Sequence, residues 1–468
     1  MEISPIVRNA HEELSAYNIK FLEYAKENPR YQERSRFEEI IKWGHPASAT
    51  NENLQPWPLF INPRTRNEFE RASVGLFNLI KGVLRRLFSD DPSRIARYYY
   101  LPEDFVRFCM DGSNEKHMSG LVGRGDFLIS SSGLKCLEYN VSSSLGGWEL
   151  PVWEPIYLRN PLISEFVKKF RVKILNKDLL FILFDHLIKS TLEWFPDENE
   201  INIVISIYNR EILAATSTLE EQFSRQYINA LQFNSKTKRL KGEIMFSCLD
   251  QLDIVGNSLY FRGKKINTLV HGYTGDIPLQ ILSLFKMRKL LIYNGAITPI
   301  VSNKFNISLL SEHEDSDLFT PAERETIKKY VPWTRKVIEG VTTYREEKIN
   351  LENFILSNKD KLVLKPAMGY GGEGVYVGYF TPQEQWEVLS RNAFQQNFWV
   401  VQECVECRPL LFQWGENGCV EFDATWGMMV FGQKYGGVLL RVLPREKTRG
   451  VINVHQGAEV PVVFEVEE

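Results

Sequence analysis

The first quarter of the chain carries apolar residues at helical spacing. FEEIIKWG (37–44) and ASVGLFNLIKGVLRRLF (72–88) both place apolar side chains three and four positions apart, which is typical of amphipathic helices. We therefore expect residues 1–115 to form a mainly helical region. This region contains no motif that suggests chemistry. It could form a packing layer or a cap over a substrate site, and the sequence does not decide between the two.

The middle of the chain alternates between strand and helix patterns. The pattern predicts strands over 120–155 and helix over 161–195, and the apolar run INIVISI (201–207) is typical of a buried strand. KINTLVHGYTG, PLQILSLFKMR and KLLIYNG then follow as strand, helix and strand between 265 and 295. These segments predict an open α/β layer over about 200–300.

The last third begins with a strong helix start and continues mainly as strands. Thr320 is a candidate N-cap, with Pro321 in the first helical position and Glu323 three residues after the cap. LVLKPAMGYGGEGVYVG (362–378) predicts two strands around a glycine-rich loop, and a helix over 382–394 precedes further strands to the end. The chain has no internal repeats and no low-complexity segments.

The glycine-rich loop is the first candidate for chemistry. Glycine tolerates positive φ and lets a ligand approach the backbone, so a loop of this kind can cradle phosphates with its N–H groups. Lys365 ends the strand that enters the loop, where its ammonium could reach phosphate oxygens. No GK[ST] follows and the loop leads to a strand, so this is not a P-loop. A plain hairpin with a flexible tip is an equally good interpretation of this segment.

A second candidate is the hairpin GRGDFLISSSGLKCLEYNV (123–141). A loop over 131–133, with Gly133 in the left-handed position, places Asp126 opposite Glu138 and Arg124 opposite Asn140, all on one face. Opposed carboxylates repel each other and call for a cation between them. Carboxylate and amide oxygens are ligands that Mg²⁺ prefers. The alternative is a solvated strand face with an incidental Arg–Asp pair.

Composition excludes several classes of function. The 468 residues are 44% hydrophobic and 25% charged, with a net charge of −3, which gives no case for binding nucleic acid or an anionic membrane. The N-terminus has no apolar segment of a signal peptide, and the longest apolar run, LLFILF (179–184), is too short to span a membrane. Six scattered cysteines suggest free thiols in the cytoplasm. Cys404 and Cys407 form a lone CxxC that we interpret as a chance pair. The sequence leaves open whether the protein forms a homodimer.

The two motifs together resemble a known superfamily. LVLKPAMGYGGEGVYVG resembles the lysine and glycine-rich loop of ATP-grasp proteins, and RGD followed by EYN resembles the Mg²⁺ hairpin of the glutathionylspermidine synthase group. The hairpin precedes the loop here, which is the order of circularly permuted ATP-grasp families. The resemblance covers about 120–150 and 290–468. It implies an α/β (α+β) fold: a permuted ATP-grasp core, an open α/β pre-ATP-grasp-like layer and the helical N-terminal region. The domains expected are 1–115 (helical), 116–155 (metal hairpin of the core), 156–310 (α/β layer) and 311–468 (nucleotide-binding).

The resemblance also implies roles for individual residues. Asp126, Glu138 and Asn140 would hold the metal, and Arg124 and Arg441 would act on the transferred phosphate. Lys304, in VSNK, and Lys365 match the two nucleotide lysines. The remaining nucleotide-binding residues would be Gly369, Gly371, Gly372, Gly374, Gln402, Glu403 and the Val405 backbone. Asn453, in GVINVHQGA, is a weaker match, and His455 lies beside it.

The implied activity is amide-bond formation by an ATP-dependent carboxylate–amine ligase. Such an enzyme uses ATP and Mg²⁺ to turn a small-molecule or peptide carboxylate into an acyl phosphate, which an amine substrate then attacks. Ser142, Ser143 and Ser144 follow the hairpin directly and could bind the carboxylate, although a plain polar turn is as good an interpretation. The family's acidic continuation after EYN is replaced here by VSSSLGGWE, and no cysteine–histidine amidase region is present. A small-molecule kinase or a non-catalytic nucleotide-binding scaffold on the same fold are the alternatives.

Overall fold

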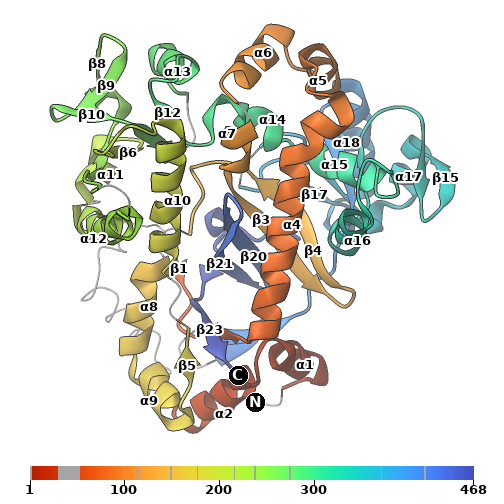
Figure 1. Ribbon diagram of the computed structural model, residues 1–468. Coiled ribbons are helices and arrows are strands. Elements are labelled where there is room, and N and C mark those ends of the chain that lie inside the picture. The colour runs from red at the N-terminus through yellow and green to blue at the C-terminus, as the bar shows by residue number, and fades with distance from the viewer. Residues whose placement is uncertain are drawn as a thin grey trace.

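A sheet of seven strands forms the centre of the molecule in the computed structural model (Figure 1). The structure describes residues 3–29, 53–113, 115–147, 150–175, 178–215, 217–236, 239–273, 276–369, 371–415 and 418–468, so the helix expected at 37–44 lies outside the described residues. The strands run in the order β1-β22-β21-β20-β3-β4, with β19 also paired to β20. They are β1 (Asn53–Leu54), β3 (Val122–Ser130), β4 (Gly133–Asn140), β19 (Leu410–Trp414), β20 (Gly418–Phe431), β21 (Lys434–Pro444) and β22 (Glu459–Val460).

One face of this central sheet is covered by the long helix α4 (Pro63–Phe88) (Figure 1). Asn62 caps the helix by accepting from the Thr65 N–H at 2.8 Å, and Phe69 packs against Trp426 of β20 with ring centroids 5.1 Å apart. The other helices of this region are α1 (Pro5–Leu14), α2 (Ala16–Glu27), α5 (Pro92–Tyr99), α6 (Glu103–Asp111) and α7 (Glu115–Ser119).

The first 115 residues also contribute two strands that the helical pattern did not predict. β1 pairs in parallel with β22, and β2 (Leu59–Ile61) pairs in parallel with β23 (Val463–Glu467). β5 (Lys173–Ile174) extends β23 on its other side. Strands of two or three residues are too short to show an alternating pattern. The N-terminal region is therefore joined to the C-terminus through sheet pairing.

A second antiparallel sheet, in the order β13-β18-β16-β17, lies beside the central sheet. It confirms the strand–loop–strand prediction around the glycines, since β16 (Leu362–Pro366) pairs with β17 (Tyr376–Val377). The predicted capping box at Thr320 and Glu323 is confirmed as well. The other elements here are β13 (Thr334–Lys336), β14 (Val341–Tyr344), β15 (Glu347–Asn350), β18 (Trp399–Glu403), α14 (Thr298–Val301), α15 (Phe305–Glu312), α16 (Pro321–Tyr330), α17 (Leu351–Ser357) and α18 (Gln383–Gln396).

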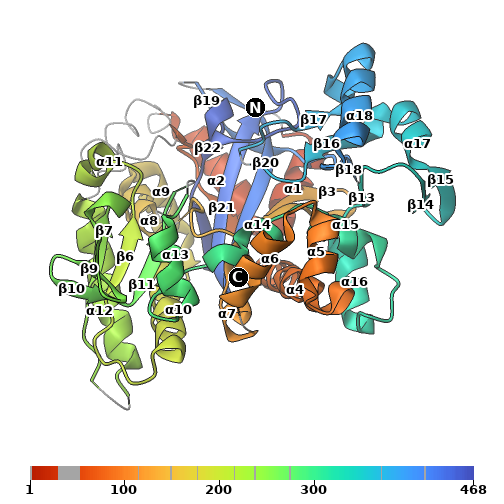
Figure 2. The same ribbon diagram turned by 90° about the horizontal axis from the view of Figure 1, so that it is seen from above.

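A parallel sheet in the order β12-β11-β6-β7 lies on the opposite side of the central sheet (Figure 2). It confirms the open α/β layer predicted for 200–300. The strands are β6 (Ile203–Ser206), β7 (Ile244–Ser247), β11 (Thr268–His271) and β12 (Leu291–Ile292), and a small meander is made by β8 (Asp253–Val255), β9 (Ser258–Phe261) and β10 (Lys264–Ile266). The helices are α9 (Pro161–Phe170), α10 (Leu179–Trp194), α11 (Arg210–Ala215), α12 (Ser217–Asn234) and α13 (Leu279–Lys286).

One segment differs from the sequence-based prediction. We expected strands as far as residue 155, but Leu150–Arg159 forms the helix α8. Trp153, Ile156 and Tyr157 are buried at helical spacing, so tertiary burial of one helix face decides the structure although Pro155 lies within it. Among the described residues, no helix is both long and apolar enough to cross a membrane.

Candidate active site

A cavity of about 1050 Å³ lies between the two antiparallel sheets. Strands β3, β4, β20 and β21 of the central sheet form one wall, and β16, β17 and β18 contribute to the other. Most of the predicted site residues line this cavity. They are Arg124, Asp126, Glu138, Asn140, Ser142, Ser144, Lys365, Gly371, Gly372, Gln402, Glu403, Val405, Arg441 and the weaker candidate Asn453.

The β3–β4 hairpin has the predicted register at the site, although its turn is shorter than predicted and its second strand contains a bulge. Asp126 is paired with Glu138 and Arg124 with Asn140, as expected. The predicted loop over 131–133 is wrong, because Ser130 pairs with Gly133 and leaves a two-residue turn. A bulge at Leu137, which has no partner in β3, shifts the register back by one residue.

The bulge also connects the two walls of the cavity. The Leu137 carbonyl oxygen accepts from Lys365 Nζ at 3.4 Å and from Gln402 Nε2 at 3.3 Å. Both donors belong to the second sheet, since Lys365 is in β16 and Gln402 in β18. The extra residue in the β3–β4 hairpin therefore ties this hairpin to the strand that enters the glycine loop.

Asp126 is a buried carboxylate held by two arginines. Arg124 Nε and Arg441 Nη2 lie 2.8 and 3.0 Å from Asp126 Oδ1. Burial alone would raise the pKa of Asp126, but the two guanidinium groups outweigh it and lower the pKa to about 2. Asp126 is therefore ionised at neutral pH. The Nε of Arg441 is buried and has no acceptor among the described residues.

Glu138 faces two lysines from distant parts of the chain. Lys304 Nζ lies 3.4 Å from Glu138 Oε2, and Lys365 is close enough to act on the same carboxylate. Burial opposes ionisation of Glu138, yet Lys304 and Lys365 bring its pKa below the ordinary value. Burial lowers the pKa of Lys365 to about 8, and Lys304 adds repulsion.

Lys304 joins the glycine loop to the hairpin. Its backbone N–H donates to the Ala367 carbonyl at 2.9 Å, and its Nζ donates to the Gly369 carbonyl at 3.3 Å. Two residues earlier, Ser302 Oγ exchanges hydrogen bonds with the backbone of Val141, at the end of the hairpin. These contacts bring together three segments that are far apart in sequence.

All four loop glycines adopt positive φ, as their predicted role requires. The φ values are +141° at Gly369, +67° at Gly371, +76° at Gly372 and +71° at Gly374. A Cβ atom at Gly372 would lie 2.4 Å from Val451 Cγ1. Glycine is therefore required at Gly372 both by backbone conformation and by space. Gly369 and Gly374 lie in the loop but do not line the cavity.

The predicted adenine-binding segment lies at the end of β18. Gln402 Oε1 accepts from Lys365 Nζ at 2.6 Å, and Gln402 Nε2 donates to Thr334 Oγ1 at 3.0 Å. Glu403 Oε1 accepts from Tyr344 and Arg345, each at 3.1 Å. The segment is thus tied to the β14–β15 hairpin at the edge of the cavity.

The three serines after the hairpin separate into two groups. Ser142 and Ser144 line the cavity, with their Oγ atoms 2.9 Å apart. Ser143 is buried elsewhere, and its Oγ donates to the His271 carbonyl at 2.8 Å. The structure therefore brings Ser142 and Ser144 to the site and does not bring Ser143. The side chain of His455 is outside the described residues.

The cavity also contains charged residues that the sequence analysis missed. Asp423 and Thr425 project into it from β20, and Arg445 follows β21. Burial raises the pKa of Asp423 to about 6, against the influence of Arg445, whose Nε lies 3.5 Å from Asp423 Oδ1. The alternation FDATW marks Asp423 and Thr425 as one face of a strand, and this signal could have identified them.

The hairpin residues suit a small hard cation. Asp126 Oδ2 and Glu138 Oε1 both accept from Asn140 Nδ2, at 3.1 and 3.2 Å, so the two carboxylates lie side by side on one face of the hairpin. The described residues contain no group of three or more His, Cys, Asp or Glu side chains that is arranged to hold a metal ion. Mg²⁺ is typically held by one or two carboxylates together with substrate phosphates, and the oxygen donors present fit that pattern.

Comparison with known proteins relates the chain to others through its fold. No family model matches the sequence, and no curated protein matches it. A candidate gamma-glutamylcysteine synthetase from Methylobacillus flagellatus aligns with 82% of this chain and 86% of its own, at 12% identity and a TM-score of 0.41. A glutathione synthetase-like effector from Globodera pallida, in its apo form, aligns with 89% of this chain and 90% of its own, at 12% identity and a TM-score of 0.54. The chain therefore has a mixed α/β fold similar to that of this synthetase-like effector.

Proposed function

We propose that the protein is an ATP-dependent carboxylate–amine ligase on a circularly permuted ATP-grasp fold. The observation that carries this proposal is a charge imbalance at the hairpin. Four cations, Arg124, Lys304, Lys365 and Arg441, surround only two carboxylates, Asp126 and Glu138. Three of the four cations are buried, and Arg124 is nearly so.

Buried positive charge without a counter-ion is unfavourable. Its cost is visible in the lowered pKa of Lys365 and in the unpaired Nε of Arg441. An anionic ligand of high charge removes this cost when it binds, and a triphosphate beside a loop of positive-φ glycines meets the requirement. The imbalance therefore favours a nucleoside triphosphate over a neutral ligand.

The residues then have separate tasks. Lys304 and Lys365 hold phosphate oxygens, and Arg124 and Arg441 stabilise charge on the phosphoryl group during transfer. Gln402, Glu403 and the Val405 backbone contact the adenine, and the Gly371–Gly372 segment covers the phosphates. Asp126, Glu138 and Asn140 would hold Mg²⁺, which when bound neutralises charge on the phosphate oxygens.

The reaction needs no nucleophilic side chain from the protein. A substrate carboxylate oxygen attacks the γ-phosphorus, and ADP leaves. The amine nitrogen then attacks the acyl carbon, and phosphate leaves as the C–N bond forms. Ser142 and Ser144 are placed to donate to the carboxylate, and closure of the glycine loop excludes water from the acyl phosphate. The similarity in fold to a glutathione synthetase-like effector supports this class of reaction.

The proposal is tested by incubating the protein with ATP, Mg²⁺ and pooled amino acids, short peptides and polyamines, and measuring products by mass spectrometry. A ligase releases ADP and phosphate and gives a product lighter by one water than its two substrates. A product heavier by one phosphoryl group would identify a kinase instead. Bound ATP without turnover on any pool would identify a nucleotide-binding scaffold. Asp126→Asn serves as the inactive control.

A further inference from the structure

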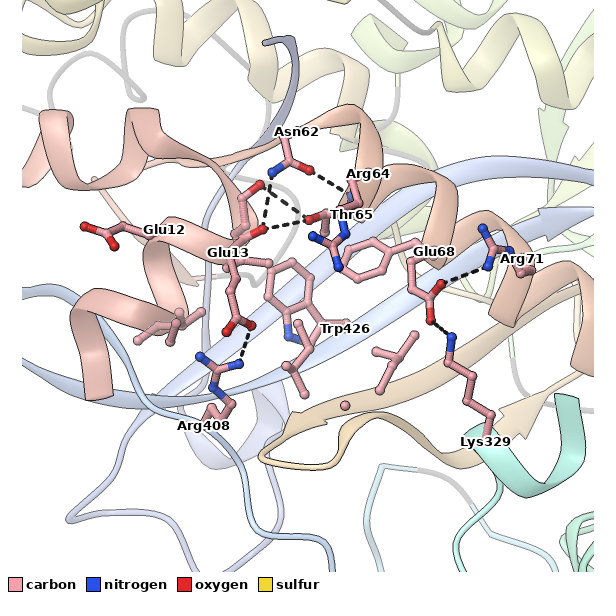
Figure 3. Close-up of a pocket in the computed structure, with 17 residues that line it drawn as sticks. Glu12, Glu13, Asn62, Arg64, Thr65, Glu68, Arg71, Lys329, Arg408 and Trp426 are labelled. Carbon is pink, nitrogen blue, oxygen red and sulfur yellow. Dashed lines mark hydrogen bonds and ion pairs between the residues drawn. The ribbon is translucent and has the colours of Figure 1, made fainter. Parts of the chain in front are cut away.

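A second cavity, of about 710 Å³, lies on the other face of the central sheet, away from the candidate active site (Figure 3). Strand β20 separates the two cavities, because Asp423 and Thr425 line the first and Trp426 lines the second. Helices α1 and α4, the end of α16, the turn end of the β3–β4 hairpin and β19 form its other sides. None of the residues assigned above to nucleotide, metal or substrate lines it.

The base of this second cavity is apolar and includes one unused polar group. Leu134, Leu410 and Phe69 surround Trp426, which is 1% exposed. The indole N–H of Trp426 makes no hydrogen bond within the described part of the chain. An indole N–H at the base of an apolar cavity can donate to an acceptor atom of a ligand that fills the cavity. Figure 3 shows Trp426 in the middle of the labelled charged side chains.

The rim carries one more positive charge than negative charge. Arg64, Arg71, Lys329 and Arg408 stand against Glu12, Glu13 and Glu68. Most are already paired: Arg408 with Glu13, and both Lys329 and Arg71 with Glu68, at 2.6 Å and 3.5 Å. Arg64 has no ion-pair partner in the described residues. The rim therefore favours a ligand with a single negative charge, placed near Arg64.

We propose that the second cavity binds a small hydrophobic carboxylate, with its apolar body over Trp426 and its carboxylate on Arg64. The volume is within the usual range for sites of small organic ligands. The unpaired indole N–H and the unpaired guanidinium supply two donors for an anionic acceptor. This site does not depend on the nucleotide chemistry of the first cavity.

The probe for this site is 4-phenylbutyrate, with 4-phenylbutanamide as its uncharged match. Calorimetry on the full chain should show 4-phenylbutyrate binding, and Arg64→Gln should weaken it about tenfold, because a charge-assisted hydrogen bond to the carboxylate is lost. The amide should bind wild type about as weakly as the carboxylate binds Arg64→Gln. Arg64 is exposed, so the substitution should not affect folding.

Arg85→Gln is the matched control, since Arg85 is an exposed arginine at the other end of α4, paired with Glu115. It should bind the probe like wild type. The second readout is the indole N–H resonance of Trp426, assigned by its absence in Trp426→Phe, which should shift on adding the probe. Equal binding in Arg64→Gln and wild type, an unmoved Trp426 resonance, or no binding at millimolar probe would each overturn the proposal.

Discussion

The two faces of the central sheet use charge in opposite ways. At the β3–β4 hairpin beside the first cavity, Asp126, Lys365 and Arg441 are 4%, 6% and 7% exposed. There the four cations Arg124, Lys304, Lys365 and Arg441 stand against the two carboxylates Asp126 and Glu138. In the second cavity, Glu13, Arg71 and Lys329 have side chains 56%, 67% and 48% exposed, and nearly every charge has a partner close by. Exposed pairs contribute little to stability, whereas an excess of buried cations is relieved when an anion binds. The difference agrees with the two proposals above, a highly charged ligand in the first cavity and a singly charged one in the second.

The largest expected effect comes from the buried carboxylate. Asp126→Asn should reduce turnover below detection, because Arg124 and Arg441 lose the charge that positions them and one predicted metal ligand is weakened. The protein should stay folded because asparagine keeps the shape and an acceptor oxygen, but its free energy of unfolding should fall because Arg124 and Arg441 lose a buried counter-ion. The measurements are ADP release and the free energy of unfolding in urea.

Glu13→Gln on the other face provides the control for this substitution. Glu13 pairs with Arg408 in an exposed position, so its loss should change the free energy of unfolding by less than ~1 kcal/mol. Turnover should be unchanged. Comparable activity in Asp126→Asn and Glu13→Gln would remove the distinction between the two cavities.

The next effect concerns nucleotide affinity. Lys365→Met should weaken ATP binding about ten- to a hundredfold, because it removes one charge-assisted contact to phosphate. The free energy of unfolding of the ligand-free protein should change less than ATP affinity, because losing the hydrogen bonds from Lys365 Nζ to Gln402 and Leu137 offsets the gain from removing a buried ammonium. Calorimetric ATP titration and urea unfolding measure the two quantities.

Lys329→Met is the matched change in the second cavity. It removes the ammonium that lies 2.6 Å from Glu68 and should leave ATP affinity as in wild type. If both lysine variants bind ATP normally, the nucleotide site proposed here is misplaced.

A smaller effect is expected from the glycine loop. Gly372→Ala should lower kcat/KM for ATP about tenfold, because the added Cβ meets Val451 and a left-handed conformation costs a non-glycine residue ~1–2 kcal/mol. Gly256→Ala, between β8 and β9, has a similar φ of +59° but open space around the new Cβ. It should cost similar backbone strain and keep full activity. An equal loss of activity in both would show that strain alone, and not the position of the loop, is responsible.

The smallest effect is a linkage to protons. Burial lowers the pKa of Lys365 to about 8, so part of the lysine is neutral at pH 8.5 in the free protein. Phosphate binding favours the charged form, and ATP binding should therefore take up a fraction of a proton at pH 8.5 and none through Lys365 at pH 6.5. Calorimetry in buffers of high and low ionisation enthalpy measures the uptake.

The lowered pKa of Lys365 also affects the stability of the free protein. Because the folded-state pKa of Lys365 is lowered, its contribution to the stability of the free protein should increase as pH rises from about 8 towards the ordinary value of 10.5. Lys365→Met should lack both the proton uptake and this rise. Uptake that persists in the variant would assign the titration to another group.

The sequence by itself determined the local chemistry of this protein. Alternation and turn residues predicted a hairpin with Asp126 facing Glu138, glycines in a loop after Lys365, and an open α/β layer near 200–300, since each depends on neighbouring residues. The resemblance of two short motifs pointed to residues as distant as Lys304 and Arg441. The hairpin register at the site, the positive φ of the loop glycines and the α/β layer are confirmed, because side-chain spacing and backbone conformation are set locally there. The roles of Lys304 and Arg441 stay predictions.

Only the tertiary structure decided how these pieces meet. The bulge at Leu137 corrects a turn that is one residue shorter than predicted, and it does so because the freed carbonyl accepts from Lys365 and Gln402 of another sheet. Tertiary contacts also decide the position of Ser143, whose hydroxyl donates to the His271 carbonyl away from the cavity. They likewise decide the helix α8, which forms where strands were expected. Contacts between residues far apart in sequence fix these features, and no local pattern encodes them.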